Sequence, residues 1–293
     1  MRYEIAHELR LTYSAPVWEH HLEARLTPQH TAHQRVLAAD LATDPPCELR
    51  AYDDYFGNRV HYGSIIAPHD HLTVRLRAQV DTLLDNPFDY AAVAAARESE
   101  WLAERLREQP RLADYVLHRS PLTADLRTLP AGAATAPARE RAHTLLESVM
   151  AALEWIGEAI EYLPGFSHAP APLEDVLARG SGGCQDLTHL LISIVRTWGV
   201  PARYVMGYQD PGYAEDEGDG QRPHAWAEVV VPGAGWRGVD PATRLVANQT
   251  YVAVAIGRDA ADAVPLKAVF KSAHEGDAAE ADTEVVVEVT RDQ

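Results

Sequence analysis

The stretch GSGGCQDLTHLLISIVRTWGVPARY, residues 180–204, places Cys184 where a glycine-rich loop turns into a mostly apolar helix. Backbone N–H groups are unpaired at the start of a helix and the helix dipole presents partial positive charge there, which favours a thiolate. The preceding glycines leave room for a substrate backbone to approach closely. Cys184 is therefore a candidate nucleophile, although a lone cysteine more often fills space in a core.

A base and an orienting carboxylate follow along the chain. His224 begins the predicted strand HAWAEVVV, and Asp240 ends the next one, GWRGVD, after a PGAG turn. If these strands pair as a hairpin, the two side chains lie together at its open end, where the carboxylate would hold the imidazole in one tautomer. Taken singly, His224 is more simply a strand-end residue and Asp240 before Pro241 a turn former. With Cys184 they form a candidate Cys-His-Asp triad.

Four neighbours of these residues have possible supporting roles. Asp186 is expected to cap the helix rather than to face the sulfur, where it would oppose the thiolate. His189 is expected to be structural, and Trp226 is expected to pack in the hairpin rather than to hold substrate. The amide of Gln185 is a possible oxyanion donor, although the backbone N–H of Cys184 is better placed if the helix starts there.

The charge balance and the cysteines narrow the function further. With 26 basic and 43 acidic residues the net charge is −17, which argues against a nucleic-acid partner. The acidic run YAEDEGDG, residues 213–220, either borders the cleft and favours cationic substrates or is a solvated loop. Cys47 and Cys184 lack CxxC partners, and no DxDxDG calcium motif is present, so we expect no metal and no cofactor.

The chain carries no sign of a membrane segment. Its N-terminus alternates apolar and charged residues without a hydrophobic signal region, and no run of about 18 apolar residues occurs. We expect a cytoplasmic protein with two free thiols and no membrane partner. The sequence leaves the oligomeric state open. The HDH cluster at 69–71 and the other nearby histidines lack metal-ligand spacing, and solvated loop histidines are the expected interpretation.

The order of predicted elements indicates an α+β protein with two parts. Alternating patterns predict strands at 3–13, 20–28, 34–43, 47–66 and 71–82, followed by helices over 91–108 and 138–162 with a linker at 130–140 between them. A helix is predicted to begin at residue 183, and predicted strands follow it up to residue 290. We therefore divide the chain into an antiparallel β domain, residues 1–85, and a helical segment with a catalytic core, residues 86–293.

Three motif blocks resemble those of bacterial transglutaminase-like proteins: GGCQDLTHLLISIVRTWGVPARYVMGY, HAWAEVVVPGAGW and GVDPATR. The likeness is strong over 165–245. The segments YSAPVWEHHLEARLTP and YDDYFGNRVHYGSI resemble the β-rich N-terminal region that accompanies this core, and IGRDAAD at 256–262 resembles the block after it. The sequence departs from the family pattern at Gly183 and in the ending Asp240-Pro241-Ala242-Thr243-Arg244. These departures affect the expected shape of the substrate pocket and leave the three candidate catalytic residues in place.

This resemblance implies a papain-like core in which Cys184 is the nucleophile, His224 the general base and Asp240 its orienting partner. It implies attack on an amide of a peptide or protein substrate through a thioester acyl-enzyme. We expect hydrolysis, by a peptidase or amidase. Transfer of a glutamine acyl group to an amine is the alternative reaction, and a non-catalytic binding module on the same scaffold is the alternative of a different class.

Overall fold

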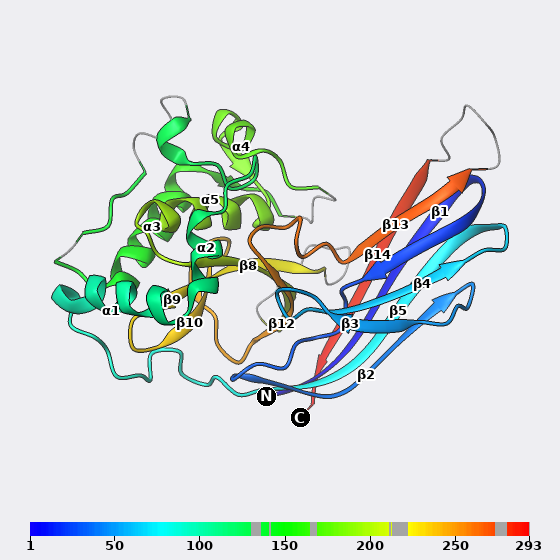
Figure 1. Cartoon of the computed structure of the whole chain (residues 1–293), viewed down its shortest axis with the longest axis horizontal. Coiled ribbons are helices and arrows are strands. Elements are labelled where there is room, and N and C mark those ends of the chain that lie inside the picture. The colour runs from blue at the N-terminus through cyan, green and yellow to red at the C-terminus, as the bar shows by residue number, and fades with distance from the viewer. Residues whose placement is uncertain are drawn as a thin grey trace.

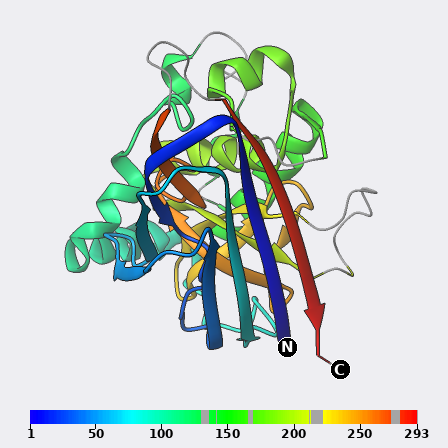
Figure 2. The same ribbon diagram turned by 90° about the vertical axis from the view of Figure 1, so that its right-hand side faces the viewer.

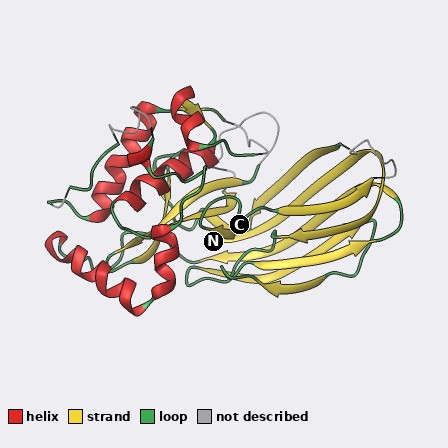
Figure 3. Cartoon of the chain, turned by 45° about the horizontal axis from the view of Figure 1, so that its top comes forward, coloured by secondary structure: helices red, strands yellow, loops and turns green. Residues whose placement is uncertain are grey.

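The computed structural model describes most of the chain, namely residues 1–129, 136–140, 142–164, 169–210, 212, 222–272 and 280–292. Figure 1 shows that the described residues form two lobes, one built of strands alone and one in which helices cover a smaller sheet. Figure 3, coloured by secondary structure, shows the helices together on one side of the molecule.

The strand-only lobe is a seven-stranded antiparallel sheet. Its strands are β1 (Arg2–Ala24), β2 (Gln34–Asp44), β3 (Arg50–Asp53), β4 (Arg59–Ile65), β5 (His69–Thr82), β13 (Leu266–Ser272) and β14 (Ala281–Arg291). In place of the predicted strands 3–13 and 20–28, β1 is one long strand that turns over near its middle, where its register with β5 shifts between Thr12 and Val17. Figure 2 shows this turn. The sheet thus folds into two layers, and alternate residues of β1 fill the space between them.

The last two strands belong to this lobe. The first half of β1 pairs with β14, with Tyr3 opposite Arg291 and Tyr13 opposite Ala281, and its second half pairs with β13. The division of the sequence at residues 85 and 86 assigns both strands to the catalytic core, whereas the structure joins them to the N-terminal sheet. Sequence periodicity identifies a strand but carries no information about its distant partner.

The second lobe carries the helices and a five-stranded antiparallel sheet of order β11-β10-β9-β8-β12. Its strands are β8 (Ala202–Gln209), β9 (His224–Val231), β10 (Gly235–Asp240), β11 (Leu245–Val246) and β12 (Tyr251–Gly257). Its helices are α1 (Ala95–Glu108), η1 (Pro110–Ala113), α2 (Asp114–Leu117), η2 (Leu126–Thr128), α3 (Leu145–Ala159), α4 (Leu173–Arg179) and α5 (Cys184–Thr197), and β6 (Glu161–Tyr162) pairs with β7 (Ser181–Gly182).

Local sequence explains where the central helices begin and how they pack. The helix predicted over 138–162 begins at Leu145, because Thr144 and Glu147 form a capping box at its N-terminus. The apolar face of α5, which includes Leu187 and Leu191, shares one core cluster with the small side chains of Ala225 and Ala227 on β9. This packing fixes the start of α5 relative to the start of β9.

Two buried amide side chains join the lobes along the free edge of β12. Gln34 donates to the carbonyl oxygen of Ala253 at 2.8 Å and accepts from its N–H at 2.8 Å. Asn58 makes the same pair of bonds with Ile256, both at 2.8 Å. Each amide thus replaces a neighbouring strand, so the β lobe completes the hydrogen bonding of the smaller sheet.

For two of the N-terminal histidines, His20 and His69, the structure corrects the interpretation as solvated loop residues. His69 begins strand β5, and His20 is fully buried between the layers of the sheet. Their rings are stacked, with Nδ1 of His20 3.0 Å from Nε2 of His69. Burial above all, and then the neighbouring histidines, lower the pKa of His20 to about 4. No group of metal-binding side chains occurs within the described ranges.

Gly207 is a point where the sheet tolerates no side chain. It lies opposite His224 in the β8–β9 pairing, and a Cβ built on it would stand 2.0 Å from the carbonyl oxygen of Val252. We expect Gly207→Ala to lower the free energy of unfolding by about 3 kcal/mol or more, because two strands must separate to admit the methyl group. Urea unfolding of both proteins measures this, and a loss below about 0.5 kcal/mol would contradict the packing described.

Candidate active site

Cys184 is the first residue of α5 and its side chain is almost wholly enclosed, with 5 % of the residue exposed. Gly183 before it has extended backbone, and its N–H donates to Oδ2 of Asp186 at 3.1 Å. Oδ1 of the same carboxylate accepts from the N–H of Ala171 at 3.0 Å. Asp186 therefore holds the loop before the cysteine against the first turn of the helix, as a capping role predicts.

His224 and Asp240 lie side by side at the open end of the β9–β10 hairpin. Strand pairing places Val239 opposite Ala227, and Nε2 of His224 is 2.8 Å from Oδ2 of Asp240. The imidazole also hydrogen-bonds the side chain of Cys184. Because Asp240 occupies Nε2, Nδ1 is the ring nitrogen left for another partner. The structure thus brings together the three residues that the motifs single out.

The electrostatics of this group favour a protonated imidazole. Burial alone would lower the pKa of His224, but the charge and hydrogen bond of Asp240, together with Cys184, raise it from 6.5 to about 10. Burial likewise opposes the charge on Asp240, yet His224 and two hydroxyl groups hold the pKa of Asp240 below its ordinary value. The ring is therefore an imidazolium at neutral pH, held between a carboxylate and a sulfur.

Two further residues fix the carboxylate, and the motifs alone do not reveal them as part of the site. Asp240 is fully buried, and its Oδ2 accepts from Thr243 Oγ1 at 2.9 Å and from the Tyr251 hydroxyl at 2.8 Å. Oδ1 accepts from the N–H of Ala242 at 2.9 Å. Thr243 is recognisable in sequence as the hydroxyl of a turn that begins at an aspartate. Tyr251 begins another strand, and nothing in its spacing marks it.

The remaining predicted residues have partners that define their roles. The Tyr204 hydroxyl donates to Oε1 of Gln185 at 3.1 Å, so this amide is turned toward strand β8. His189 stacks on Tyr204, and its Nε2 accepts from the N–H of Ala260 at 3.1 Å. Burial lowers the pKa of His189 to about 4, which makes it a neutral residue of the core.

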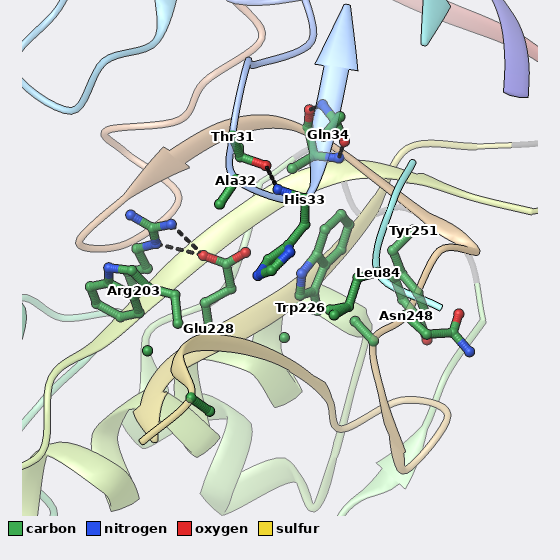
Figure 4. A pocket seen from close by; sticks show the side chains of 16 residues that line it. Thr31, Ala32, His33, Gln34, Leu84, Arg203, Trp226, Glu228, Asn248 and Tyr251 are labelled. Atoms are coloured by element: carbon green, nitrogen blue, oxygen red, sulfur yellow. Dashed lines mark hydrogen bonds and ion pairs between the residues drawn. The ribbon is translucent and has the colours of Figure 1, made fainter. Parts of the chain in front are cut away.

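Trp226 lies beside the site on the opposite sheet face from α5. It packs in one cluster with Tyr251, and its ring stacks 6.3 Å from the ring of His224. A pocket of about 300 Å³ lies against the side of Trp226 that faces away from His224. Figure 4 shows that His33 of the β lobe points into this pocket beside the Arg203–Glu228 ion pair. Trp226 and Tyr251 thus form a wall between this pocket and the His224–Asp240 pair.

Three further expectations concern the acidic run, a membrane segment and the two cysteines. The acidic run at 213–220 lies outside the described residues. Among the helices that the structure describes, none is long and apolar enough to span a membrane. Cys47 and Cys184 are both free thiols, and Cys47 is half-buried in the β lobe.

Comparison with known proteins places this geometry in a family. Residues 3–81 match the bacterial transglutaminase-like N-terminal region, and residues 133–241 match the transglutaminase-like superfamily. An uncharacterized protein of Mycobacterium leprae is 30 % identical over 294 residues, covering 99 % of both chains. The chain belongs to the bacterial transglutaminase-like family. An uncharacterized protein of Mycobacterium tuberculosis is 29 % identical over 97 % of this chain and 92 % of its own.

A solved structure shares the whole architecture of this transglutaminase-like protein. A protein from Cytophaga hutchinsonii, described as a candidate cysteine protease, superposes with a TM-score of 0.73 and 21 % identity, covering 100 % of this chain and 92 % of its own. The predicted fold class is therefore confirmed: an N-terminal antiparallel β module with a papain-like transglutaminase core, whose cysteine helix packs on an antiparallel sheet.

Proposed function

We propose that this transglutaminase-like protein is a cysteine-dependent hydrolase of amide bonds in peptides or proteins. The observation that carries the proposal is that the His224 imidazole, held by Asp240 at 2.8 Å, also interacts with the side chain of Cys184. Membership of the family and the fold of a candidate cysteine protease support cysteine chemistry in general. The roles of the individual residues follow from their geometry.

The Cys184 sulfur is the nucleophile. The imidazolium of His224 and the unpaired N–H groups at the start of α5 both favour the thiolate. The thiolate attacks the amide carbonyl carbon, and the oxygen becomes an oxyanion within reach of the Cys184 backbone N–H. His224 then gives its Nδ1 proton to the leaving nitrogen, so the C–N bond breaks, a free amine departs and a thioester remains.

The thioester is resolved by a second attack. The neutral His224 ring takes a proton from a water molecule, whose oxygen adds to the thioester carbonyl and expels the Cys184 thiolate with release of a carboxylic acid. Asp240, which Thr243 and Tyr251 hold in place, stabilises the imidazolium in both steps. An amine entering in place of water would give transamidation with the same residues.

Water as the second nucleophile is favoured by a single consideration. The neighbour that shares the whole fold is described as a candidate cysteine protease, which is an enzyme that hydrolyses amides. Turnover of the true substrate with and without a primary amine distinguishes the two reactions, because hydrolysis gives a free acid in both cases. An amine adduct as the main product would establish the transferase instead.

Thiol labelling tests the proposed nucleophile without a known substrate. At about pH 6 an ordinary thiol is mostly protonated and reacts slowly, whereas a thiolate paired with an imidazolium stays reactive. We expect iodoacetamide to label Cys184 at least about 10 times faster than Cys47, as measured by peptide mass spectrometry. Equal and slow labelling of both cysteines would favour the non-catalytic binding module.

A further inference from the structure

A slot opens between the two layers of the β lobe, and nothing in the proposed mechanism uses it. It has a volume of about 330 Å³ and runs between strands β13 and β14 over the floor of β1. Figure 1 shows both strands on the same side of the lobe. Leu266, Ala268 and Phe270 form one wall, and Thr283 and Val285 form the other. This volume lies at the lower end of the range for small-molecule sites.

The lining of the slot is apolar because of strand alternation. Residues 266, 268 and 270 face inward and are half-buried, while Val269 between them is 71 % exposed on the outer face. The charged residues of the two strands alternate with the lining residues, among them Lys267 on β13 and Glu284 on β14. The slot therefore offers half-exposed hydrocarbon surface and excludes a charged chain.

One end of the slot adjoins the candidate active site. Pro223 lines it, and the next residue is His224, whose ring contacts Cys184. This end of the slot is therefore one position along the chain from the proposed general base. The opposite end is marked by Phe270 and Ala281, farther out along the β lobe.

The floor of the slot holds a single polar side chain, His7, with an unused nitrogen. His7 is 1 % exposed, its Nδ1 lies 2.7 Å from the Tyr208 hydroxyl, and its Nε2 has no hydrogen-bond partner among the described residues. Burial lowers the pKa of His7 to about 4, so the ring is neutral at pH 7. A buried ring nitrogen without a partner is costly unless a ligand meets it.

We infer that this slot binds an aliphatic segment of the substrate next to the amide that Cys184 attacks. The β lobe is then part of the substrate site and selects hydrocarbon side chains over charged ones. The inference rests on the proposed function, because it takes Cys184 as the reacting atom.

Alkylation of Cys184 by reagents of different chain length tests the slot. The probes are N-ethyl iodoacetamide and N-octyl iodoacetamide, used on the full chain. The rates at which the two probes alkylate glutathione are measured as the reference for their intrinsic reactivity. We expect the octyl-to-ethyl rate ratio at Cys184 to exceed the ratio for glutathione about tenfold or more, because several methylene groups are buried before the reaction. At Cys47 the ratio should match that of glutathione.

Two substitutions on neighbouring residues of β13 supply a matched pair. Ala268→Trp fills the slot and should bring the ratio at Cys184 down to that of glutathione, whereas Val269→Trp adds the same ring to the outer face and should leave it raised. Thermal unfolding of both variants verifies that each is folded. If Ala268→Trp does not fold, Thr283→Phe fills the slot from the other wall and replaces it in the test.

The outcomes separate the slot from the nucleophile. A raised ratio that falls with slot-filling substitutions supports the slot. A ratio equal to that of glutathione in the wild type, or one that Ala268→Trp and Thr283→Phe leave raised, overturns it while the proposed function stands. Failure of Cys184 to react faster than Cys47 even with iodoacetamide overturns the proposed function, and the slot inference with it.

Discussion

Cys184→Ala is expected to abolish amide cleavage, with kcat lowered by about 10⁴-fold or more. The sulfur is the proposed nucleophile of the Cys184, His224 and Asp240 group, and alanine leaves His224 and Asp240 paired but without it. The measurement is the rate of product release from a mixture of peptide amides, quantified by mass spectrometry. Stability should change little, because the side chain that is removed is small.

Cys47→Ala is the matched control for this loss. Cys47 is half-buried in the β lobe, where its Sγ lies 3.5 Å from the Thr43 hydroxyl, and it has no place in the proposed mechanism. Its removal should leave turnover at the wild-type rate. If Cys184→Ala retained wild-type turnover on a substrate whose products had been identified, Cys184 would not be the nucleophile.

Asp240→Asn is expected to lower kcat by about 10²- to 10⁴-fold while the fold is retained. The amide keeps the shape of the carboxylate and can still accept from Thr243 and Tyr251, but it no longer stabilises the imidazolium. Because the charge of Asp240 is what raises the pKa of His224 to about 10, the variant should lose activity at a lower pH than the wild type. The pH profile of kcat therefore distinguishes an electrostatic role from a merely structural one.

The same substitution has a defined effect on stability. A histidine whose folded pKa is raised from 6.5 to about 10 stabilises the protein fully below pH 6.5, and this contribution is lost as the pH rises through about 10. The free energy of unfolding of the wild type should therefore exceed that of Asp240→Asn most at pH 6, and the difference should narrow toward pH 10. Asp282→Asn, on an exposed position of β14, should show no such trend. A difference independent of pH would contradict the assigned ion pair.

Local patterns in the sequence predict most elements but not their distant partners. Strand β9, strand β10 and helix α5 lie where alternation and the glycine-rich loop indicate, because their boundaries depend on adjacent residues. The hairpin between His224 and Asp240 follows from a short turn, so this contact is predictable. The assignment of β13 and β14 to the N-terminal sheet is not, since their pairing with β1 spans more than two hundred residues of chain.

The same reasoning explains which site residues the sequence misses. Tyr251 reaches Asp240 from a strand that lies beside β8, and the sequence gives no hint of that neighbour. His69 lies in the HDH cluster between two predicted strands and His20 at the start of another, yet the turn in β1 buries both between the layers. Long-range packing decides these cases, and a single sequence does not encode it in a local pattern.

The pairing of β1 with β13 and β14 governs the order in which this protein is completed during synthesis. The first half of β1 emerges early from the ribosome but finds its partner β14 only when residues 281–291 are made. Until then one edge of β1 presents unpaired backbone groups while the whole helical lobe is being translated. The β lobe is thus the last part to close, and a nascent chain stalled after β12 is the form most exposed to aggregation.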